Sequence, residues 1–224
     1  MTPPRALITG SGHLGRTGNN LARTFAEQGI QPILHYRSSG DGAQRTLDEL
    51  DVDTFAVQGD LTRPGVAQRI VDEIQDRVGG LEIVVHPIGN YNRLIWETNV
   101  DSAKAIAQAA LPLLLKADYG RIVFFGAAGI ERPEKAGYAP DYQDAKRALL
   151  RYARALAVDH IAQGVTVNMV SPGEMTYSIL DAITMPLGRA VTPDELARAV
   201  MFFIDPQAGA VTGQNLEVAG GLHL

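Results

Sequence analysis

The sequence has 224 residues, 46% hydrophobic and 20% charged, a balance typical of a soluble globular protein that buries a sizeable core. A net charge of −5 without a basic block argues against nucleic-acid binding, and the lack of cysteine excludes disulfides and thiolate metal sites. No apolar stretch approaches the ~20 residues of a membrane span. The apolar run after Arg5 is also too short for a signal peptide, so we expect a cytoplasmic protein without a metal site.

The first elements in chain order are a strand, a glycine-rich turn and a helix. A short apolar strand at residues 6–9 leads to Gly10, and a glycine-rich segment at 11–18 precedes a helix predicted over 19–28. Glycines let the backbone approach a pyrophosphate, whose charge the helix N-terminus attracts. The pattern indicates a dinucleotide site, although a plain glycine-rich turn between strand and helix has the same appearance.

The end of the second strand bears on which dinucleotide is bound. This strand is predicted over residues 32–36 and is followed by Arg37 and Ser38. At this place an acidic residue suits the free ribose hydroxyl of NAD, whereas arginine suits the 2′-phosphate of NADP. Arg37 therefore favours NADP(H), the alternative being a solvated loop arginine.

The remaining elements continue to alternate. Helices are predicted over 42–50, 66–78, 94–115, 141–163 and 193–204, and strands over 54–58, 83–85, 121–125, 166–170 and 215–218. Pro112 predicts a kink or early stop, and Thr192 is a candidate N-cap. Because the strands are apolar on both faces, a parallel sheet is expected. The pattern predicts one Rossmann-type, doubly wound α/β domain over residues 1–224, with about seven parallel strands and helices on both faces.

Tyr142 and Lys146 carry the clearest chemical signal. Four residues make about one helical turn, so the two side chains share a face of the predicted helix. A cation beside a phenol lowers its pKa, which would let the pair pass a proton near neutral pH. Such a pair also arises by chance, so its meaning depends on its surroundings.

Those surroundings resemble the short-chain dehydrogenase/reductases over nearly the whole chain, from Ala6 to Gly221. The matching segments occur in the family's order. They are Thr9-Gly10 with Gly15 and Gly18, Asp60-Leu61, Gly89, Asn99, Tyr142 with Lys146, Asn168 to Thr176, Pro186 to Arg189, and Val211 to Gly221. The overall pattern is most similar to 3-oxoacyl-carrier-protein reductases, and the end of the second strand also resembles pteridine reductases.

The resemblance implies a role for each matching residue. Tyr142 would give or take the substrate proton, and Lys146 would lower its pKa and hold the nicotinamide ribose. Asn99 would keep a water in a proton relay, Asp60 would bind the adenine, and Thr176 the carboxamide. Asn99 could instead satisfy helix backbone, and Asp60 could cap a turn. The implied NADP(H)-binding residues are Gly10, Ser11, Leu14, Gly15, Gly18, Tyr36, Arg37, Ser38, Asp60, Leu61, Ile88, Gly89, Tyr142, Lys146, Pro172, Gly173, Met175 and Thr176.

The most consequential departure from the family is the loss of its catalytic serine. Ala127 occupies the aligned position, and no Ser or Thr occurs between Arg121 and Asp141. That serine donates a hydrogen bond to the developing oxyanion, and losing one such donor costs about 10²–10³ in turnover. Tyr138 is the only hydroxyl in the segment, and it could substitute if its loop folds inward.

Other departures concern the walls of the site. His86-Pro87 replaces two asparagines of the family, and we interpret His86 as a structural group, with a role in the site as the alternative. The cofactor loop is two residues longer than usual. The segment from Thr176 to Pro186 is short, which predicts an open site that admits a bulky or carrier-tethered substrate, or else the loss of substrate binding.

Three functions remain open at this stage. The first is an NADP(H)-dependent reductase of a ketone or related C=O or C=N group, with Tyr142 as proton donor. The second is a catalytically impaired NADP(H)-binding protein that acts as a sensor or partner subunit, and the third is a lyase or epimerase. The resemblance implies a homodimer or homotetramer formed through helices around 103–110 and 145–157, although their alanines could equally pack on their own sheet.

Overall fold

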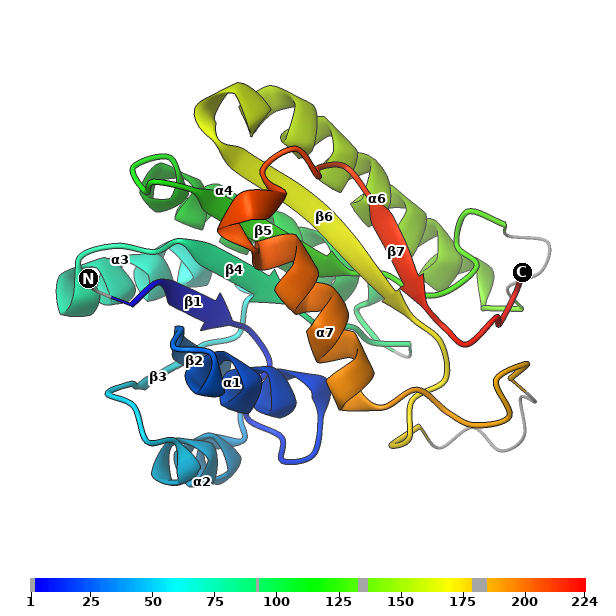
Figure 1. The fold of residues 1–224 in the computed structure, drawn as a ribbon, viewed down its shortest axis with the longest axis horizontal. Helices are drawn as coiled ribbons and strands as arrows, with labels where there is room; N and C mark the ends of the chain where they lie inside the picture. The colour runs from blue at the N-terminus through cyan, green and yellow to red at the C-terminus, as the bar shows by residue number, and fades with distance from the viewer. Residues whose placement is uncertain (1–2, 92, 133–136, 179–184) are drawn as a thin grey trace.

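A single sheet of seven parallel strands runs through the computed structural model, in the order β3-β2-β1-β4-β5-β6-β7 (Figure 1). The structure describes residues 3–91, 93–132, 137–178 and 185–224. The strands are β1 (Arg5–Ile8), β2 (Gln31–Tyr36), β3 (Ala56–Gln58), β4 (Ile83–His86), β5 (Gly120–Phe125), β6 (Val165–Pro172) and β7 (Asn215–Val218). The predicted fold class and the number of strands are confirmed.

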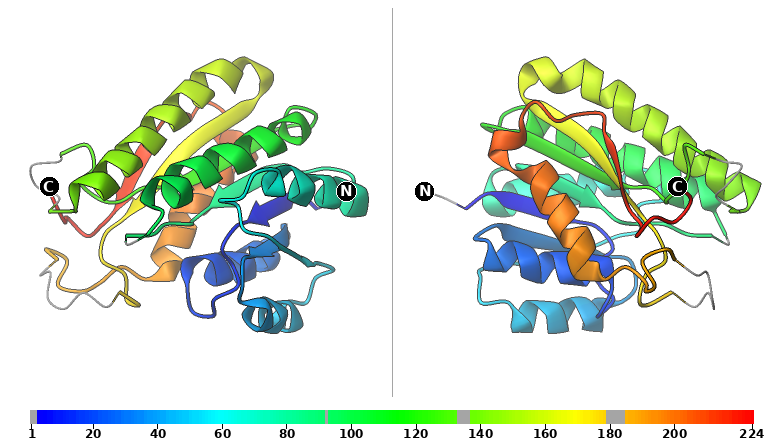
Figure 2. Two further views of the ribbon diagram at one scale, coloured as in Figure 1. Left: turned by 180° about the vertical axis from the view of Figure 1, so that it is seen from behind. Right: turned by 45° about the vertical axis from the view of Figure 1, so that its right-hand side comes forward.

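Helices cover both faces of this sheet. They are α1 (Thr17–Glu27), α2 (Gly40–Glu49), α3 (Val66–Val78), α4 (Ser102–Leu114), α6 (Pro140–His160) and α7 (Pro193–Ile204), with short turns η1 (Glu97–Asp101), η2 (Ile161–Gln163) and η3 (Pro206–Ala208). Helices α1, α2 and α7 lie on the face seen in Figure 1, and α3, α4 and α6 lie on the face seen from behind in Figure 2.

Each face of the sheet has its own hydrophobic core. Side chains alternate between the faces of a strand, so Leu7 enters the core under α3, α4 and α6, while Ala6 and Ile8 enter the core under α1 and α7. Strand β4 divides in the same way, with Val84 on one side and Ile83 on the other. Burial on both faces explains why the strand sequences are apolar throughout.

The order of the strands fixes where a ligand can lie. Strand β1 pairs with β2 on one side and with β4 on the other, so the strand order reverses at β1: the chain runs outward to β3 and then crosses back to β4. In such sheets the crevice at the carboxyl ends of the diverging strands is the place where ligands bind. The glycine-rich segment after β1 and residues 87–91 after β4 both start at this edge.

Several local predictions can be compared with the elements. The predicted helix over 94–115 is divided into the π-helical turn η1 and α4, and Pro112 lies inside α4 shortly before its end at Leu114. Thr192 caps α7 as predicted, because its Oγ1 accepts from the Glu195 amide while the Glu195 carboxylate accepts from the Thr192 amide. This reciprocal arrangement is a capping box.

Within the residues that the structure describes, no helix is both long enough and apolar enough to cross a membrane.

Candidate functional site

The predicted catalytic residues come from two elements, α6 and η1, at the carboxyl edge of the sheet, and the predicted cofactor-binding residue Gly89 lies beside them. Tyr142 and Lys146 lie in the first two turns of α6, Asn99 lies in η1, and Gly89 follows β4. A Cβ atom added at Gly89 would lie 3.3 Å from Asn99 Oδ1 and 3.3 Å from Lys146 Nζ. The absence of a side chain at Gly89 therefore lets both polar groups approach its backbone closely.

Lys146 is fully buried at the carboxyl end of β5. Its Nζ donates a hydrogen bond of 2.8 Å to the backbone carbonyl of Phe125, the last residue of that strand. Burial lowers the pKa of Lys146 to about 7, because the charged ammonium loses its hydration. The side chain thus titrates close to neutral pH, which is unusual for lysine.

Asn99 hydrogen-bonds to backbone groups, which is the role that we considered as the alternative to holding a water. Its Nδ2 donates to the carbonyls of Asn90 and Ile95, each at 2.8 Å, and its Oδ1 accepts from the Asn90 amide at 3.3 Å. These bonds hold the connection after β4 against η1. A π-helical turn is a frequent companion of functional sites, and here it sets the position of Asn99.

Tyr142 is only 3% exposed and lies beneath Tyr91, whose ring centroid is 4.2 Å from its own. Burial raises the pKa of Tyr142 well above its ordinary value, and the neighbouring Tyr91 and Tyr138 raise it further. The expected lowering by Lys146 is therefore outweighed in this structure, where Lys146 Nζ lies 5.7 Å from the Tyr142 ring centroid. The phenol keeps its proton at neutral pH.

The loop after β5 folds inward at its far end. Ala127 is buried and contributes only a methyl group, whereas Tyr138 places its ring 5.5 Å from that of Tyr142, at an edge-on angle of 67°. The other edge contact of Tyr138 is with His223 near the end of the chain, at 5.9 Å. The structure therefore brings the ring of Tyr138, which carries the one hydroxyl of this segment, next to the ring of Tyr142.

The glycine-rich segment has the backbone shape that a phosphate site needs. Gly10 and Gly15 adopt positive φ angles of +69° and +70°, and a Cβ at Gly18 would lie 2.8 Å from the carbonyl oxygen of Gly10. Helix α1 thus starts directly against the loop. Its N-cap residue, Arg16, makes no capping hydrogen bond with its side chain among the described residues, which leaves the first helical amides for an anion.

The extra length of this loop reaches toward the end of β2. The backbone of Gly12 packs on Tyr36 and Ser39, where a Cβ would lie 2.8 Å from atoms of each. The ring of His13 lies within 3.2–3.3 Å of Ser39 Oγ. Arg37, the residue after Tyr36, is exposed. The loop therefore packs against the end of β2, next to the predicted 2′-phosphate residues.

Ser11 and His35 are buried and tie the glycine-rich loop to β2. Ser11, predicted to contact the cofactor, has its hydroxyl engaged with the carbonyls of Ile8 and His35. His35, which the sequence analysis missed, accepts from the Gly10 amide at Nδ1 and donates to the Gly59 carbonyl from Nε2. A histidine in the middle of an apolar strand was the only signal for it. Burial lowers the pKa of His35 to about 4, so the imidazole is neutral.

His86 is a satisfied structural group, as interpreted from the sequence. Ser102 Oγ already donates to the Thr98 carbonyl, so His86 Nε2 donates to Ser102 Oγ at 3.1 Å. Nδ1 then accepts from Thr9 Oγ1 at 2.9 Å. Burial lowers the pKa of His86 to about 3, in agreement with this neutral tautomer. The side chain joins the end of β1 to α4, beneath the crevice.

Asp60 caps the turn after β3, which is the role that we considered as the alternative to binding the adenine. Its Oδ1 accepts from the Thr62 amide at 3.1 Å and from the Thr62 hydroxyl at 2.7 Å. The hydroxyl bond is the main reason that the pKa of Asp60 is lowered. The carboxylate is thus fixed after β3, at the same edge as Tyr36 and Arg37, and its neighbour Leu61 is buried.

The other predicted cofactor residues lie along the rim of this edge. Ile88 packs against Gly10, since a Cβ there would lie 3.0 Å from Ile88 Cγ1, and Leu14 is 42% exposed. Pro172, the last residue of β6, is partly buried. After it, the Gly173 amide donates to the Val218 carbonyl at 3.0 Å, and the Thr176 amide donates to the Val191 carbonyl at 3.0 Å. Met175 is buried beneath this turn, whereas Thr176 is exposed.

A contact across the crevice joins the segment after β6 to the start of α1. The hydroxyl of Tyr177 lies 2.5 Å from Thr17 Oγ1, and the Arg16 guanidinium lies 4.5 Å from the Tyr177 ring centroid. The short segment over 176–186, predicted to leave the site open, lies largely outside the described residues, because these stop at 178 and resume at 185.

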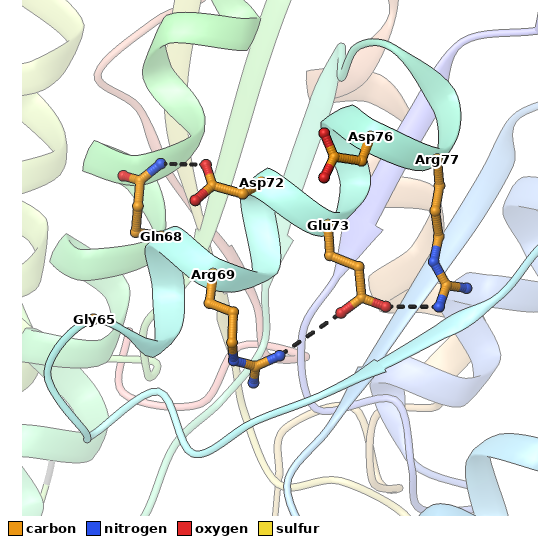
Figure 3. A pocket seen from close by; sticks show the side chains of 7 residues that line it. All are labelled: Gly65, Gln68, Arg69, Asp72, Glu73, Asp76 and Arg77. Atoms are coloured by element: carbon orange, nitrogen blue, oxygen red, sulfur yellow. Dashed lines mark hydrogen bonds and ion pairs between the residues drawn. The ribbon is translucent and has the colours of Figure 1, made fainter.

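A shallow hollow on the outer face of α3 does not belong to this site. Glu73 bridges Arg69 and Arg77, and Gln68 bonds Asp72, so most of its polar side chains pair along the helix (Figure 3). Such pairs are typical of a solvated helix surface. Among the described residues, no group of three or more His, Asp or Glu side chains is placed to hold a metal ion.

Comparison with known proteins gives a consistent result. Residues 17–223 match the family described as enoyl-(acyl carrier protein) reductase. The 3-oxoacyl-acyl-carrier-protein reductase FabG of Vibrio cholerae is 30% identical, with 98% of this chain and 97% of the relative covered. The Escherichia coli FabG is 28% identical over the same shares.

A solved structure extends this similarity to three dimensions. The crystal structure of a single-residue variant of actinorhodin polyketide ketoreductase with NADPH has a TM-score of 0.87 and 25% identity, covering 99% of this chain and 97% of that one. The match to the family covers most of the chain, the fold is shared, and the tyrosine, lysine and asparagine lie at the expected edge of the sheet. The chain belongs to the short-chain dehydrogenase/reductase family of oxidoreductases.

Proposed function

We propose that this protein is an NADP(H)-dependent reductase of a ketone or a related C=O or C=N group, in which Tyr142 supplies the proton. The observation that carries the proposal is the grouping of a protonated Tyr142 with Lys146, Asn99 and Gly89 at the edge of the sheet where the glycine-rich loop starts. A phenol that keeps its proton suits reduction, where it acts as an acid, better than oxidation, where it must act as a base.

The residues at this edge of the sheet suit a phosphorylated dinucleotide. The first turn of α1 suits the pyrophosphate, exposed Arg37 and Ser38 suit a 2′-phosphate, and Lys146 beside Gly89 suits a ribose hydroxyl. Bound NADPH would supply the hydride. The residues of the chain would then hold the carbonyl carbon toward it and give the carbonyl oxygen a proton from Tyr142.

The relatives support the choice of substrate. The FabG proteins are named for the reduction of 3-oxoacyl groups on acyl carrier protein, which makes a 3-oxoacyl thioester the first compound to test. A second line of support is the actinorhodin ketoreductase, whose structure holds NADPH. A small or carrier-tethered carbonyl compound is therefore the proposed substrate class.

The test is NADPH consumption over 3-oxoacyl thioesters, simple ketones and pterins, with Tyr142→Phe as the blank. We expect turnover by the native protein and a loss of about 10²–10⁴-fold in the variant, because a positioned proton donor contributes about that much. NADPH binding should be equal in both proteins. Equal turnover in the two proteins would refute the role of Tyr142.

A second candidate function is an NADP(H)-binding sensor or partner subunit that has lost catalysis. The specific observations in its favour are the buried methyl group of Ala127 and the coverage of Tyr142 by Tyr91. It predicts NADPH binding without turnover of any compound in the panel, in the native protein as in Tyr142→Phe.

A further inference from the structure

Carbonyl reduction places negative charge on an oxygen atom, and Tyr142 is the donor already described for it. This inference rests on the proposed reductase function. Tyr142 can donate to that oxygen, but Ala127, buried after β5, offers nothing to it. Sites of this kind stabilise the developing charge with preorganised donors in a water-poor environment. A second donor to this oxygen has to come from another polar group that lies beside Tyr142.

Two phenols contact Tyr142, and they differ in character. Tyr91 stacks over the ring at 4.2 Å and is 57% exposed. Burial raises the pKa of both phenols, and Tyr91 raises that of Tyr142 further. Because the ring of Tyr91 covers Tyr142, a substrate carbonyl can reach the Tyr142 hydroxyl only when Tyr91 moves aside.

Tyr138 approaches from another side and is better anchored. Its ring meets Tyr142 edge-on at 5.5 Å and meets the ring of His223 edge-on at 5.9 Å, so it is held between the two. Tyr138 is partly buried, and burial raises the pKa of its hydroxyl, which therefore keeps its proton. It remains a donor over the whole neutral range.

The chain holds His223 in place at a conformational cost. His223 has φ of +63°, a region that side chains other than glycine seldom adopt. Its ring rests on Gly129, where a Cβ would lie 2.9 Å from His223 Cβ. Arg132 Nε donates to the His223 carbonyl at 2.8 Å and the same guanidinium pairs with Glu217. Strained positions that are fixed by several contacts tend to occur at functional sites.

We propose that Tyr138 supplies the second hydrogen-bond donor to the substrate carbonyl oxygen, and that His223 positions it. No bond is made or broken at Tyr138. Its phenol donates while the hydride reaches the carbonyl carbon and the Tyr142 proton reaches the oxygen. Tyr138 thus takes over the task that a serine at position 127 would perform.

The first experiment compares Tyr138→Phe with the native protein in NADPH-dependent turnover. We expect kcat to fall about 10²-fold, with NADPH affinity and the melting temperature unchanged, because the ring stays and one donor is lost. Tyr152→Phe is the matched control, since Tyr152 lies further along α6 and its buried hydroxyl has no hydrogen-bond partner among the described residues. It should leave kcat unchanged.

A rescue variant separates the hydroxyl from other effects. In the Tyr138→Phe background, Ala127→Ser should restore kcat at least about tenfold, because it returns a donor to the site. A fall in kcat that Ala127→Ser does not relieve would overturn the donor role. So would equal kcat in Tyr138→Phe and native protein, an outcome that leaves the reductase function standing. Absence of native turnover over the whole panel would remove both proposals together.

The positioning role is tested by shortening the chain. Deleting residues 223–224 should lower kcat with little change in KM or in NADPH affinity, since it frees Tyr138 without touching the cofactor crevice. Deleting Leu224 alone is the control, because that side chain is 79% exposed. Equal kcat in both truncations would overturn the role of His223.

Discussion

Two opposing influences act on the acidity of Tyr142. Burial and the adjacent phenols raise the pKa of Tyr142, whereas the ammonium of Lys146, 5.7 Å from the ring centroid, stabilises the phenolate that forms as the proton leaves. The second influence exists only while Lys146 is charged. Because burial brings the pKa of Lys146 to about 7, the balance changes within the physiological range.

This balance predicts the pH dependence of reduction. Above pH about 7 the free protein loses the Lys146 charge, so kcat/KM for the carbonyl substrate should fall as pH rises through that value. Tyr142 itself stays protonated over this range. The measurement is kcat/KM between about pH 5 and 9, with Lys146→Met expected to be slow and without the inflection. A native profile that is flat through this range would contradict the assignment.

At the scale of the element, the capping box of α7 gives a stability prediction. Thr192→Ala removes the side-chain acceptor of the Glu195 amide and should lower the free energy of unfolding by about 1 kcal/mol. Thr192→Ser keeps the acceptor and is the control. Urea unfolding of both variants measures the effect. A loss of similar size in Thr192→Ser would mean that the methyl group, rather than the cap, is responsible.

The elements also show what the sequence could and could not predict. The seven strands and the helix over 66–78 follow from periodicity and glycine punctuation, which are local. The π turn at Asn99 was missed because hydrophobic periodicity does not distinguish it from the α-helix that follows. The bonds of the Asn99 side chain to Asn90 and Ile95 were also beyond reach, since they form only in the folded chain. Likewise, the order of motifs predicted Tyr142 and Lys146, whereas the contacts of Tyr138 join residues 85 positions apart, Tyr138 and His223.

The change in the pKa of Tyr142 was the least reliable of the predictions made from the sequence. The expectation that Lys146 lowers the pKa of Tyr142 considered one neighbour on the same helix. The fold adds Tyr91 and Tyr138 and removes water, and these effects are larger. Pairwise spacing cannot supply the burial of a group, which is why directions of pKa change need the folded structure.

At the scale of the whole molecule, His35 and His86 link folding to pH. Both are buried and neutral, with pKa values of about 4 and 3, against an ordinary value of 6.5 in the unfolded chain. At pH values between the folded and the unfolded pKa, the unfolded chain binds more protons than the folded protein does. The free energy of unfolding therefore decreases as pH falls below 6.5.

The expected loss for each histidine is roughly 2 kcal/mol by pH ~5. Urea unfolding as a function of pH measures it, and His86→Asn should lose about half of the slope below pH ~6.5. A slope that is unchanged in His86→Asn would show that other groups cause the acid sensitivity.

Assembly is also a property of the whole molecule. The alanines of α4 and α6 do not show whether two copies of the chain associate. Ala103, Ala107, Ala145 and Ala153 are buried within their own chain, so they are not available to a second copy. The outer surface of α6 does expose Val158, at 77%. We still predict a homodimer or homotetramer, to be measured as the mass in solution by light scattering. A protomer mass at high concentration would contradict it.

The central claim is that hydride passes to a carbonyl carbon while Tyr142 supplies the proton. The most direct measurement uses NADPH deuterated at the transferred position and a 3-oxoacyl thioester, with the product analysed by mass spectrometry and NMR. Native protein should place one deuterium on the new carbinol carbon and Tyr142→Phe almost none, although both bind NADPH. Substrate converted without deuterium, as a lyase or epimerase would do, or NADPH bound without any transfer, would contradict it.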